Sequence, residues 1–175
     1  MIRRFREIIY FIVFVALQTL VINNIHLFGI VTPFLYIYVI LKFRIDLSRT
    51  GLIILSFLLG LIIDIFSNTM GLHAASCSFI GFVRNPLLEQ FVDMKELTAR
   101  SVPSIRLLGL SKFIRYMLIM VMLHHVILFS IESFSFFQPW LMFTRMISSM
   151  LLTMLLMFIT EAFNLGNKKK WKTTD

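Results

Sequence analysis

The stretch LIILSFLLGLIIDIF, residues 52–66, is apolar except for one serine, one glycine and the carboxylate of Asp64. Similar apolar runs recur along the chain, at residues 8–22, 27–41, 52–66, 71–83, 113–131 and 140–163. Hydrophobic residues make up 58% of the sequence, and a soluble domain of this size lacks the polar surface to cover them. The sequence therefore predicts an all-α integral membrane protein, folded as a single domain with a six-transmembrane-helix bundle.

The lengths of these runs leave one of them open to a second interpretation. A helix needs about 17–25 residues to cross a bilayer. Residues 113–131 and 140–163 meet that requirement plainly, and the first four runs meet it when their flanking Asn, Ser and Thr residues are included. Residues 71–83 are the shortest run, and a re-entrant helix is the alternative there.

The basic residues favour six crossings. Lys and Arg concentrate in cytoplasmic loops. With six spans, all of the 17 Lys and Arg residues except Arg145 fall on one side. They lie near the N-terminus, in residues 42–49, in a loop of residues 84–112 with Arg115 just after it, and in a tail of residues 164–175. A re-entrant segment would move the tail to the other side. We therefore expect both termini in the cytoplasm.

The N-terminus has the start of a signal peptide without its end. Arg3 and Arg4 precede an apolar run, but Asn23 and Asn24 follow in place of a small-residue cleavage site, so we expect an uncleaved first span. The net charge of +8 gathers at loop ends and does not alternate with exposed aromatic residues. This charge pattern predicts contact with membrane lipids and no binding of nucleic acid.

The loop of residues 84–112 carries an amphipathic pattern. Pro86 can occupy the first turn of a helix, and apolar side chains recur after it at helical spacing, from Leu87 to Met94. This pattern predicts a helix lying on the cytoplasmic face. Two roles stay open for it: a connector that rests on lipid headgroups, or a docking surface for a cytoplasmic partner. The tail from Lys168 onward is expected to be polar and disordered.

The sequence has none of the usual signatures of an enzyme: no phosphate-binding glycine loop, no HExxH motif and no paired carboxylates at useful spacing. We expect no catalytic residue, cofactor or metal. His124 and His125 are adjacent, so on a helix they point about 100° apart, and a structural role is expected for each. His73 and Cys77 share a helix face, but two ligands do not make a metal site.

Asp64 is the most informative single residue, because a carboxylate within a span is costly and normally faces the bundle interior with a partner. Three roles stay open for it. It can form an ion pair with Arg145, which lies at similar depth in the last span. It can cap or border the turn at Ser67–Thr69. It can also belong to a transport or proton-relay pathway. The small residues of 71–81 predict close helix packing around it.

The stretch Gly60-Leu-Ile-Ile-Asp64, followed by Gly71-Leu-His-Ala-Ala75, resembles the signature of the rod shape-determining membrane protein family MreD. The pair His124-His125 leading to Glu132-Ser-Phe-Ser-Phe resembles the Bacteroidetes-type branch of that family. The resemblance covers about residues 5–165. The structural or functional candidates are Gly60, Asp64, Gly71, Ala75, His124, His125 and Arg145.

The resemblance implies a function that composition alone does not. Family members are non-catalytic scaffolds in the bacterial inner membrane, within the elongation machinery that makes peptidoglycan and maintains rod shape. They associate with MreC and, through it, with the MreB filament, RodA and a penicillin-binding protein. In fold the family resembles the substrate-binding subunits of energy-coupling-factor vitamin transporters. A transporter subunit is therefore the alternative, with Asp64, His73, His124, His125 and Arg145 as its polar lining.

Overall fold

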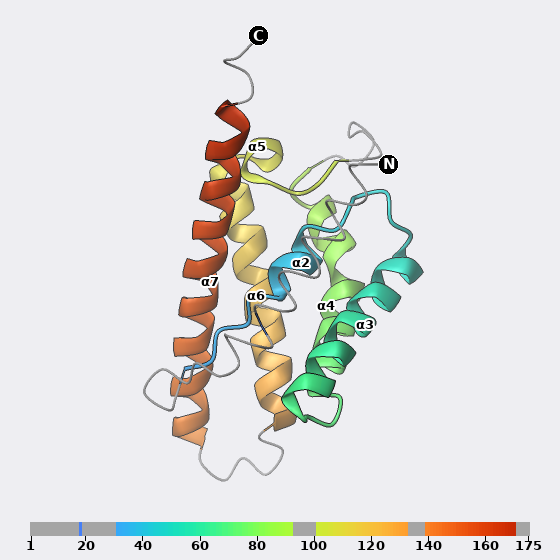
Figure 1. Cartoon of the computed structure of the whole chain (residues 1–175), viewed down its shortest axis with the longest axis vertical. Helices are drawn as coiled ribbons and strands as arrows, with labels where there is room; N and C mark the ends of the chain where they lie inside the picture. Colours follow the sequence, from blue (N-terminus) through green and yellow to red (C-terminus); the bar gives the residue numbers. More distant parts are fainter. Residues whose placement is uncertain (1–17, 19–30, 93–100, 133–138, 171–175) are drawn as a thin grey trace.

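A computed structural model describes residues 18, 31–92, 101–132 and 139–170, with side chains up to residue 164. Four long helices run up and down beside one another, and two short helices complete the described part of the chain (Figure 1). The long helices are α3 (Arg49–Ser67), α4 (Leu72–Glu89), α6 (Leu110–Glu132) and α7 (Pro139–Lys170), and the short ones are α2 (Ile37–Leu41) and α5 (Ile105–Leu108).

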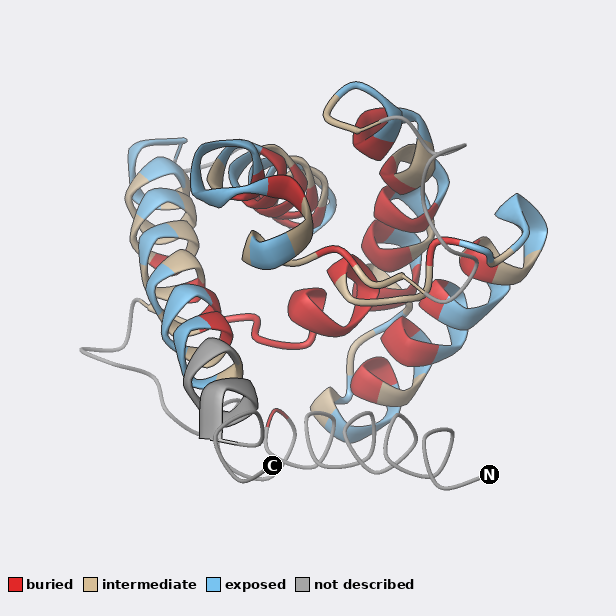
Figure 2. Ribbon diagram, turned by 90° about the horizontal axis from the view of Figure 1, so that it is seen from above, coloured by how far each residue is buried: buried red, intermediate tan, exposed pale blue. Residues whose placement is uncertain are grey.

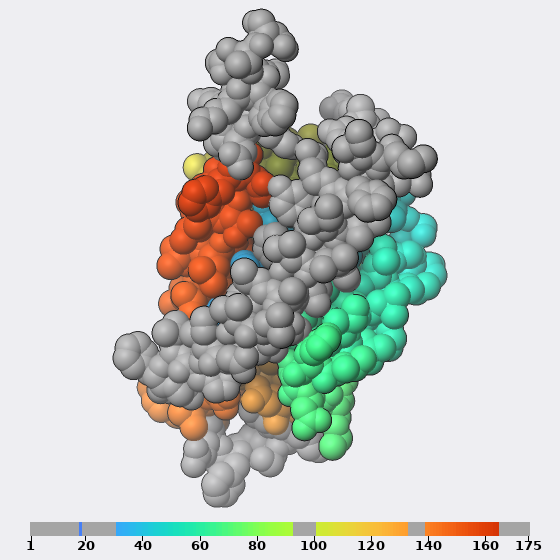
Figure 3. All heavy atoms as spheres, in the orientation of Figure 1, coloured from blue at the N-terminus to red at the C-terminus, as the bar shows by residue number. Residues whose placement is uncertain are grey.

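Three of these helices, α3, α6 and α7, are long and apolar enough to cross a membrane. Between 22% and 44% of their spanning windows is buried inside the protein. The remainder is largely apolar and faces outward, as on the flanks formed by α7 and α3 (Figure 3). A bilayer covers such a surface, so the chain is an all-α membrane protein. The helices expected at 52–66, 113–131 and 140–163 are confirmed.

The long helices form an arc around a central segment, residues 31–41, most of which is buried. Helix α3 packs on α4, α4 on α6, and α6 on α7, while α2 contacts both α4 and α6. Seen from above, α2 is buried at the centre of the bundle (Figure 2). Every residue from Pro33 to Leu41 is buried. The core of the protein is therefore built around a short helix and the extended chain that precedes it.

This central segment corrects the expectation of one continuous span over residues 27–41. The described residues 31–36 form an extended chain and a turn, and only α2 is helical. Pro33 gives the local reason, because a proline disfavours helical geometry in the residue before it. The five residues of α2 are too few to cross a bilayer by themselves, so a crossing at this position must include the extended residues 31–36 as well.

Side chains of other segments replace the helical hydrogen bonds that the central segment lacks. Thr32 N–H donates to Ser149 Oγ at 3.1 Å, and Phe34 N–H donates to Thr153 Oγ1 at 3.0 Å, both on α7. Gln18 closes the set. Its Oε1 accepts from Leu35 N–H at 2.8 Å, and its Nε2 donates to Pro33 O at 3.0 Å. Non-helical backbone at membrane depth is tolerated only when it is satisfied in this way inside the protein.

Helix α4 is longer than expected and shortens the predicted loop of residues 84–112. It continues beyond Val83 to Glu89, so Pro86 lies inside α4 and does not start a separate surface helix. The buried side chains of Leu87 and Leu88 hold this last turn against the core, which offsets the one backbone hydrogen bond that Pro86 removes. Phe91 and Val92 follow α4 and pack, partly buried, against the core, and the rest of the predicted amphipathic pattern, including Met94, lies outside the described residues.

The two ends of the chain are described to different extents. The predicted span at 8–22 lies outside the described residues except for Gln18. At the other end, α7 continues to Lys170, so residues 168–170, the first part of the tail predicted to be disordered, are helical. A helix that begins at Pro139 reaches this far because Ala, Leu, Met and Lys all favour helix.

Candidate functional site

The motif that carries the family resemblance is a joint between α3 and α4. Gly60 of α3 lies directly against the backbone of α4, where a Cβ atom added to Gly60 would stand 2.4 Å from His73 O and 2.6 Å from Ala74 Cα. Only glycine allows this approach. Gly81 of α4 is a second close contact, because a Cβ atom added to it would stand 2.5 Å from Ser56 Oγ of α3. Small residues therefore set the distance between the two helices, as expected for helix packing in membranes.

The turn between these helices needs two left-handed residues. Asn68 ends α3 with a φ of 54°, and Gly71 precedes α4 with a φ of 80°. Glycine adopts this conformation without a steric penalty. Ala75 lies one turn further along, exposed on the outer side of α4, and its N–H donates to Gly71 O at 3.0 Å. Gly71 thus shapes the hairpin, whereas Ala75 makes only the ordinary backbone hydrogen bond of the first turn of α4.

Asp64 caps α4 from the neighbouring helix. Its side chain, in a residue only 3% exposed, accepts hydrogen bonds from the N–H of His73 at 3.1 Å and of Ala74 at 2.8 Å, and from the hydroxyl of Thr69. The first N–H groups of a helix have no partner within it, and its positive dipole end favours a carboxylate. Of the three alternatives, the structure agrees with capping: Asp64 binds Thr69 of the predicted turn, and it also caps the N-terminus of α4, which the sequence did not single out.

The ion pair between Asp64 and Arg145 is not formed, which corrects the first of the three alternatives. Arg145 pairs instead with Glu132 at 3.6 Å, and the side chains of this pair are 39% and 35% exposed. Similar depth along two helices does not imply proximity: Asp64 lies on α3, which does not pack directly on α7. The two candidates thus belong to separate structural units.

The histidines converge on a tyrosine that the sequence pattern does not single out. Tyr36, in the central segment, points its hydroxyl to His73 Nδ1 of α4 at 2.8 Å and to His124 Nε2 of α6 at 2.9 Å. Tyr36 and His124 are fully buried, and His73 is 7% exposed. Three segments far apart in the sequence therefore meet in one hydrogen-bonded group.

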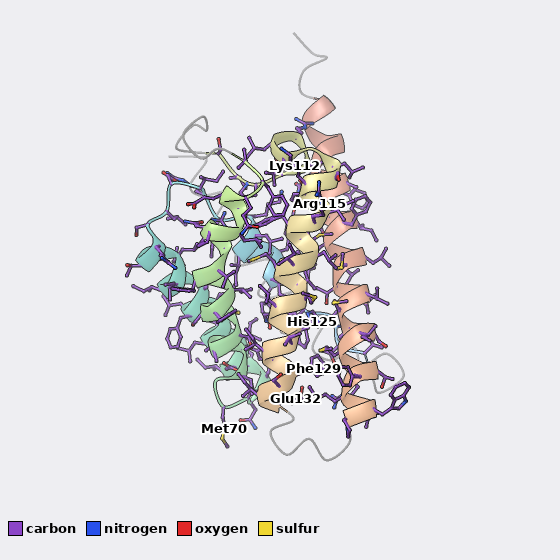
Figure 4. All side chains as sticks on the ribbon, turned by 180° about the vertical axis from the view of Figure 1, so that it is seen from behind. Met70, Lys112, Arg115, His125, Phe129 and Glu132 are labelled. Atoms are coloured by element: carbon purple, nitrogen blue, oxygen red, sulfur yellow. The ribbon has the colours of Figure 1, made fainter. Side chains whose placement is uncertain are left out.

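His125 continues this cluster toward α7, and its position on α6 is labelled in Figure 4. Its Nδ1 lies 2.8 Å from Val121 O, and its Nε2 lies 3.5 Å from Thr153 Oγ1. The ring of Phe34, from the central segment, contacts the rings of both adjacent histidines. The two histidines diverge, as expected of neighbours on a helix, and both are buried in the core.

A second buried group surrounds Glu161 of α7, which is not among the candidates from the sequence. Its carboxylate, in a residue 1% exposed, pairs with Lys42 Nζ at 2.5 Å and accepts from Tyr38 Oη at 2.6 Å and from Ile105 N–H at 3.1 Å. Lys42 also donates to Pro103 O at 2.7 Å. A carboxylate inside an apolar run is the signal that identified Asp64, and it applies equally to Glu161.

Arg84 does not lie in a cytoplasmic loop, and the structure corrects that expectation. It lies in α4 and is fully buried. Its guanidinium donates to the carbonyl oxygen of Leu41, the last residue of α2, at 3.4 Å, and to that of Phe43, two residues later. It also donates to Asn85 Oδ1 at 2.7 Å. A cation at this end of a helix is favourable. Arg84 thus anchors the C-terminal end of the central segment.

The described residues contain no group of three or more His, Cys, Asp or Glu side chains that could hold a metal ion. Comparisons with protein-family models, with curated proteins and with solved structures find no match for this chain. The hairpin motif, the two buried polar groups and the outward apolar faces are therefore the features of this chain that bear on its function.

Proposed function

We propose that the protein is a non-catalytic membrane scaffold of the bacterial cell-elongation complex, and that it binds an MreC-type membrane protein. One observation carries this proposal: the residues of the MreD-like motif hold two helices together. Gly60, Asp64 and Gly71 all serve to join α3 to α4. A motif that fixes a helical hairpin fits a protein that presents helix faces to a partner. Gly60, Asp64 and Gly71 are all engaged in this joint.

The buried polar groups support the same proposal. Asp64 already binds three donors, Tyr36 links His73 to His124, and Glu161 holds Lys42. These side chains bond to one another and link the central segment to α3, α4, α6 and α7, so they act as internal ties. Buried polar networks that connect several elements rigidify a core.

The outward faces supply the surface for a partner. The face of the α3–α4 hairpin is apolar and aromatic, and it includes Ile54, Phe57, Leu58, Leu61, Phe79 and Phe82. Helices in a bilayer associate through close packing and interhelical hydrogen bonds. An MreC-type partner with one span can lay its helix along such a face, in a position that lipid otherwise occupies.

Six spans in the inner membrane with both termini in the cytoplasm belong to this proposal. Lys112 and Arg115, near the start of α6, lie at one end of the bundle, and Glu132 lies at the other (Figure 4). Helix α4 runs alongside α3 throughout and would cross with it despite its more polar sequence. The positive-inside rule places the basic end in the cytoplasm.

The deciding experiment is co-purification with the MreC-type protein in mild detergent. The full-length partner should be recovered, and a form with its span replaced by an unrelated one should be lost. Recovery of neither form, together with normal cell shape after depletion of this protein, would overturn the proposal. Leu58→Trp on α3 and Leu155→Trp on α7, two outward positions that are 45% and 55% exposed, form a matched pair. Loss in one variant alone identifies the contact face.

A second function, the substrate-binding subunit of a vitamin-type transporter, is favoured by one observation. The central segment is unwound inside the bundle beside Tyr36 and the histidines. In transporters, interrupted helices of this kind form the substrate site. Thermal unfolding in the presence of vitamins separates the two functions, since a ligand at about 100 times its Kd stabilises the folded state by about 2.7 kcal/mol. A raised Tm with one vitamin supports the transporter.

A further inference from the structure

One ion pair of the bundle lies at its surface, between Arg145 of α7 and Glu132 at the end of α6, and both side chains are partly exposed. Glu132 lies at the end of the bundle opposite Lys112 and Arg115 (Figure 4). Arg145 follows Trp140 by five residues, or about 8 Å along α7. Trp140 is largely exposed, as is usual for a Trp at a membrane interface. Arg145 therefore belongs to the membrane-facing surface, deeper than Trp140.

The pair is too loose to explain a charged residue at this position. Its N···O distance is 3.6 Å, longer than a hydrogen bond of about 2.7–3.2 Å, and Arg145 Nε has no hydrogen-bond partner among the described residues. On the same helix, by contrast, Glu161 holds Lys42 at 2.5 Å. A loose, partly exposed pair adds little to stability, yet a charged residue within a span is costly and usually has a functional role.

The surroundings of the pair are apolar and outward-facing. Ile131 of α6 and Leu141 and Ile147 of α7 are exposed. The hydroxyls of Thr144 and Ser148 are bonded to carbonyl groups of α7 itself. The ion pair thus offers hydrogen-bonding groups on a face that is otherwise suited to close packing, and helices in a bilayer associate through both kinds of contact.

The two charges together indicate what kind of group fits here. A lipid phosphate bound to Arg145 would also stand beside the carboxylate of Glu132, and like charges repel. An Asn or Gln carboxamide suits both halves of the pair, because its oxygen accepts from Arg145 and its N–H donates to Glu132.

We propose that the Arg145–Glu132 pair is the docking point for the single span of the MreC-type partner, which meets it with a carboxamide side chain near the outer end of that span. This inference rests on the proposed scaffold function and names its contact face. Of the outward faces, it selects the outer end of α6 and α7 over the α3–α4 hairpin.

The docking point is tested by the affinity between this protein and the full-length partner, measured by energy transfer in phosphatidylcholine bilayers. Arg145→Met and Glu132→Met each remove one half of the pair and should weaken the affinity by about 3- to 20-fold, the range of interhelical hydrogen bonds in membranes. Both variants should unfold at nearly the same temperature as the unaltered protein. Arg115→Met is the matched control, because Arg115 is an exposed cation at the other end of α6 and bonds to Ser111 of its own helix; it should bind the partner normally.

The outcomes separate this inference from the function on which it rests. If the unaltered protein does not bind the full-length partner, the scaffold proposal fails, and the docking point fails with it. If the unaltered protein binds and both variants bind equally tightly, the docking point alone is overturned. A loss that appears only after phosphatidylglycerol is added assigns Arg145 to a lipid headgroup and also overturns it. If Arg145→Met does not fold, the affinity of Glu132→Met decides the question.

Discussion

At the residue scale, the absence of a side chain at Gly60 sets the separation of α3 and α4. The nearest atoms to an added Cβ are backbone atoms of His73 and Ala74, which cannot rotate away as a side chain can. Both helices would have to move apart. The same glycine would look like an unfavourable helix residue if α3 were considered alone.

Gly60→Ala should therefore lower the free energy of unfolding by about 1–3 kcal/mol, the usual range for overpacking a core. Unfolding by titration with a denaturing detergent measures the change. Gly51→Ala is the control, because a Cβ there meets only the Ser48 hydroxyl, at 3.0 Å. An equal loss in both variants would show that close approach at Gly60 is not the cause.

Asp64 and Arg145 make a second prediction at this scale. Asp64→Ala leaves two helix N–H groups without an acceptor and should cost about 1–3 kcal/mol. Arg145→Gln breaks only an exposed pair with Glu132 and should cost at most about 1 kcal/mol. Detergent unfolding of both variants gives the comparison. Similar losses, or rescue of Asp64→Arg by Arg145→Asp, would contradict this assignment.

At the element scale, the unwound central segment depends on hydroxyl groups of α7. Thr153→Val preserves the shape of the side chain but leaves Phe34 N–H without its acceptor, at an expected cost of about 1–3 kcal/mol. Thr160→Val on the same helix is the control, because the Thr160 hydroxyl bonds to Leu156 O of its own helix. Thermal unfolding should separate the two variants, and equal Tm values would refute the role of Thr153.

Glu161 ties three elements together: α7, the residue after α2, and the start of α5. Glu161→Gln leaves the charge of Lys42 without its carboxylate and should lower stability by about 3–5 kcal/mol, at the lower end because the Lys42 side chain is 16% exposed. Adding Lys42→Met should restore part of the loss. Asp46→Asn is the control, because Asp46 pairs with Arg44 at the surface, and it should cost about 1 kcal/mol or less. Equal losses for Glu161→Gln and Asp46→Asn in unfolding titrations would argue against a buried ion pair at Glu161.

At the scale of the whole molecule, the charge distribution predicts the topology. Reporter fusions after Ser48 and Lys170 should indicate the cytoplasm, and a fusion after Asn68 should indicate the outside, because basic loops are retained in the cytoplasm. Paired reporters, one active on each side, measure this directly. A fusion at Lys170 that reports the outside would require an odd number of crossings and would return residues 71–83 to the re-entrant alternative.

The sequence by itself determined the membrane class and the position of three helices. The apolar runs at 52–66, 113–131 and 140–163 are long enough to cross a membrane. Whether a helix can lie in lipid depends on its length and composition, so it can be predicted without knowing which helices lie beside it. The importance of Asp64 followed in the same way, from the cost of a carboxylate inside such a run.

Only the tertiary structure decided the partners of the polar side chains. Asp64 bonds to the N-terminus of α4 and not to Arg145. Tyr36 bonds to both His73 and His124, and Glu161 pairs with Lys42. The unwinding at Pro33 likewise depends on hydroxyl groups more than a hundred residues away on α7. Sequence position gives the depth of a residue along its own helix. Which helices lie side by side, and so which polar groups meet, follows from packing of the whole bundle.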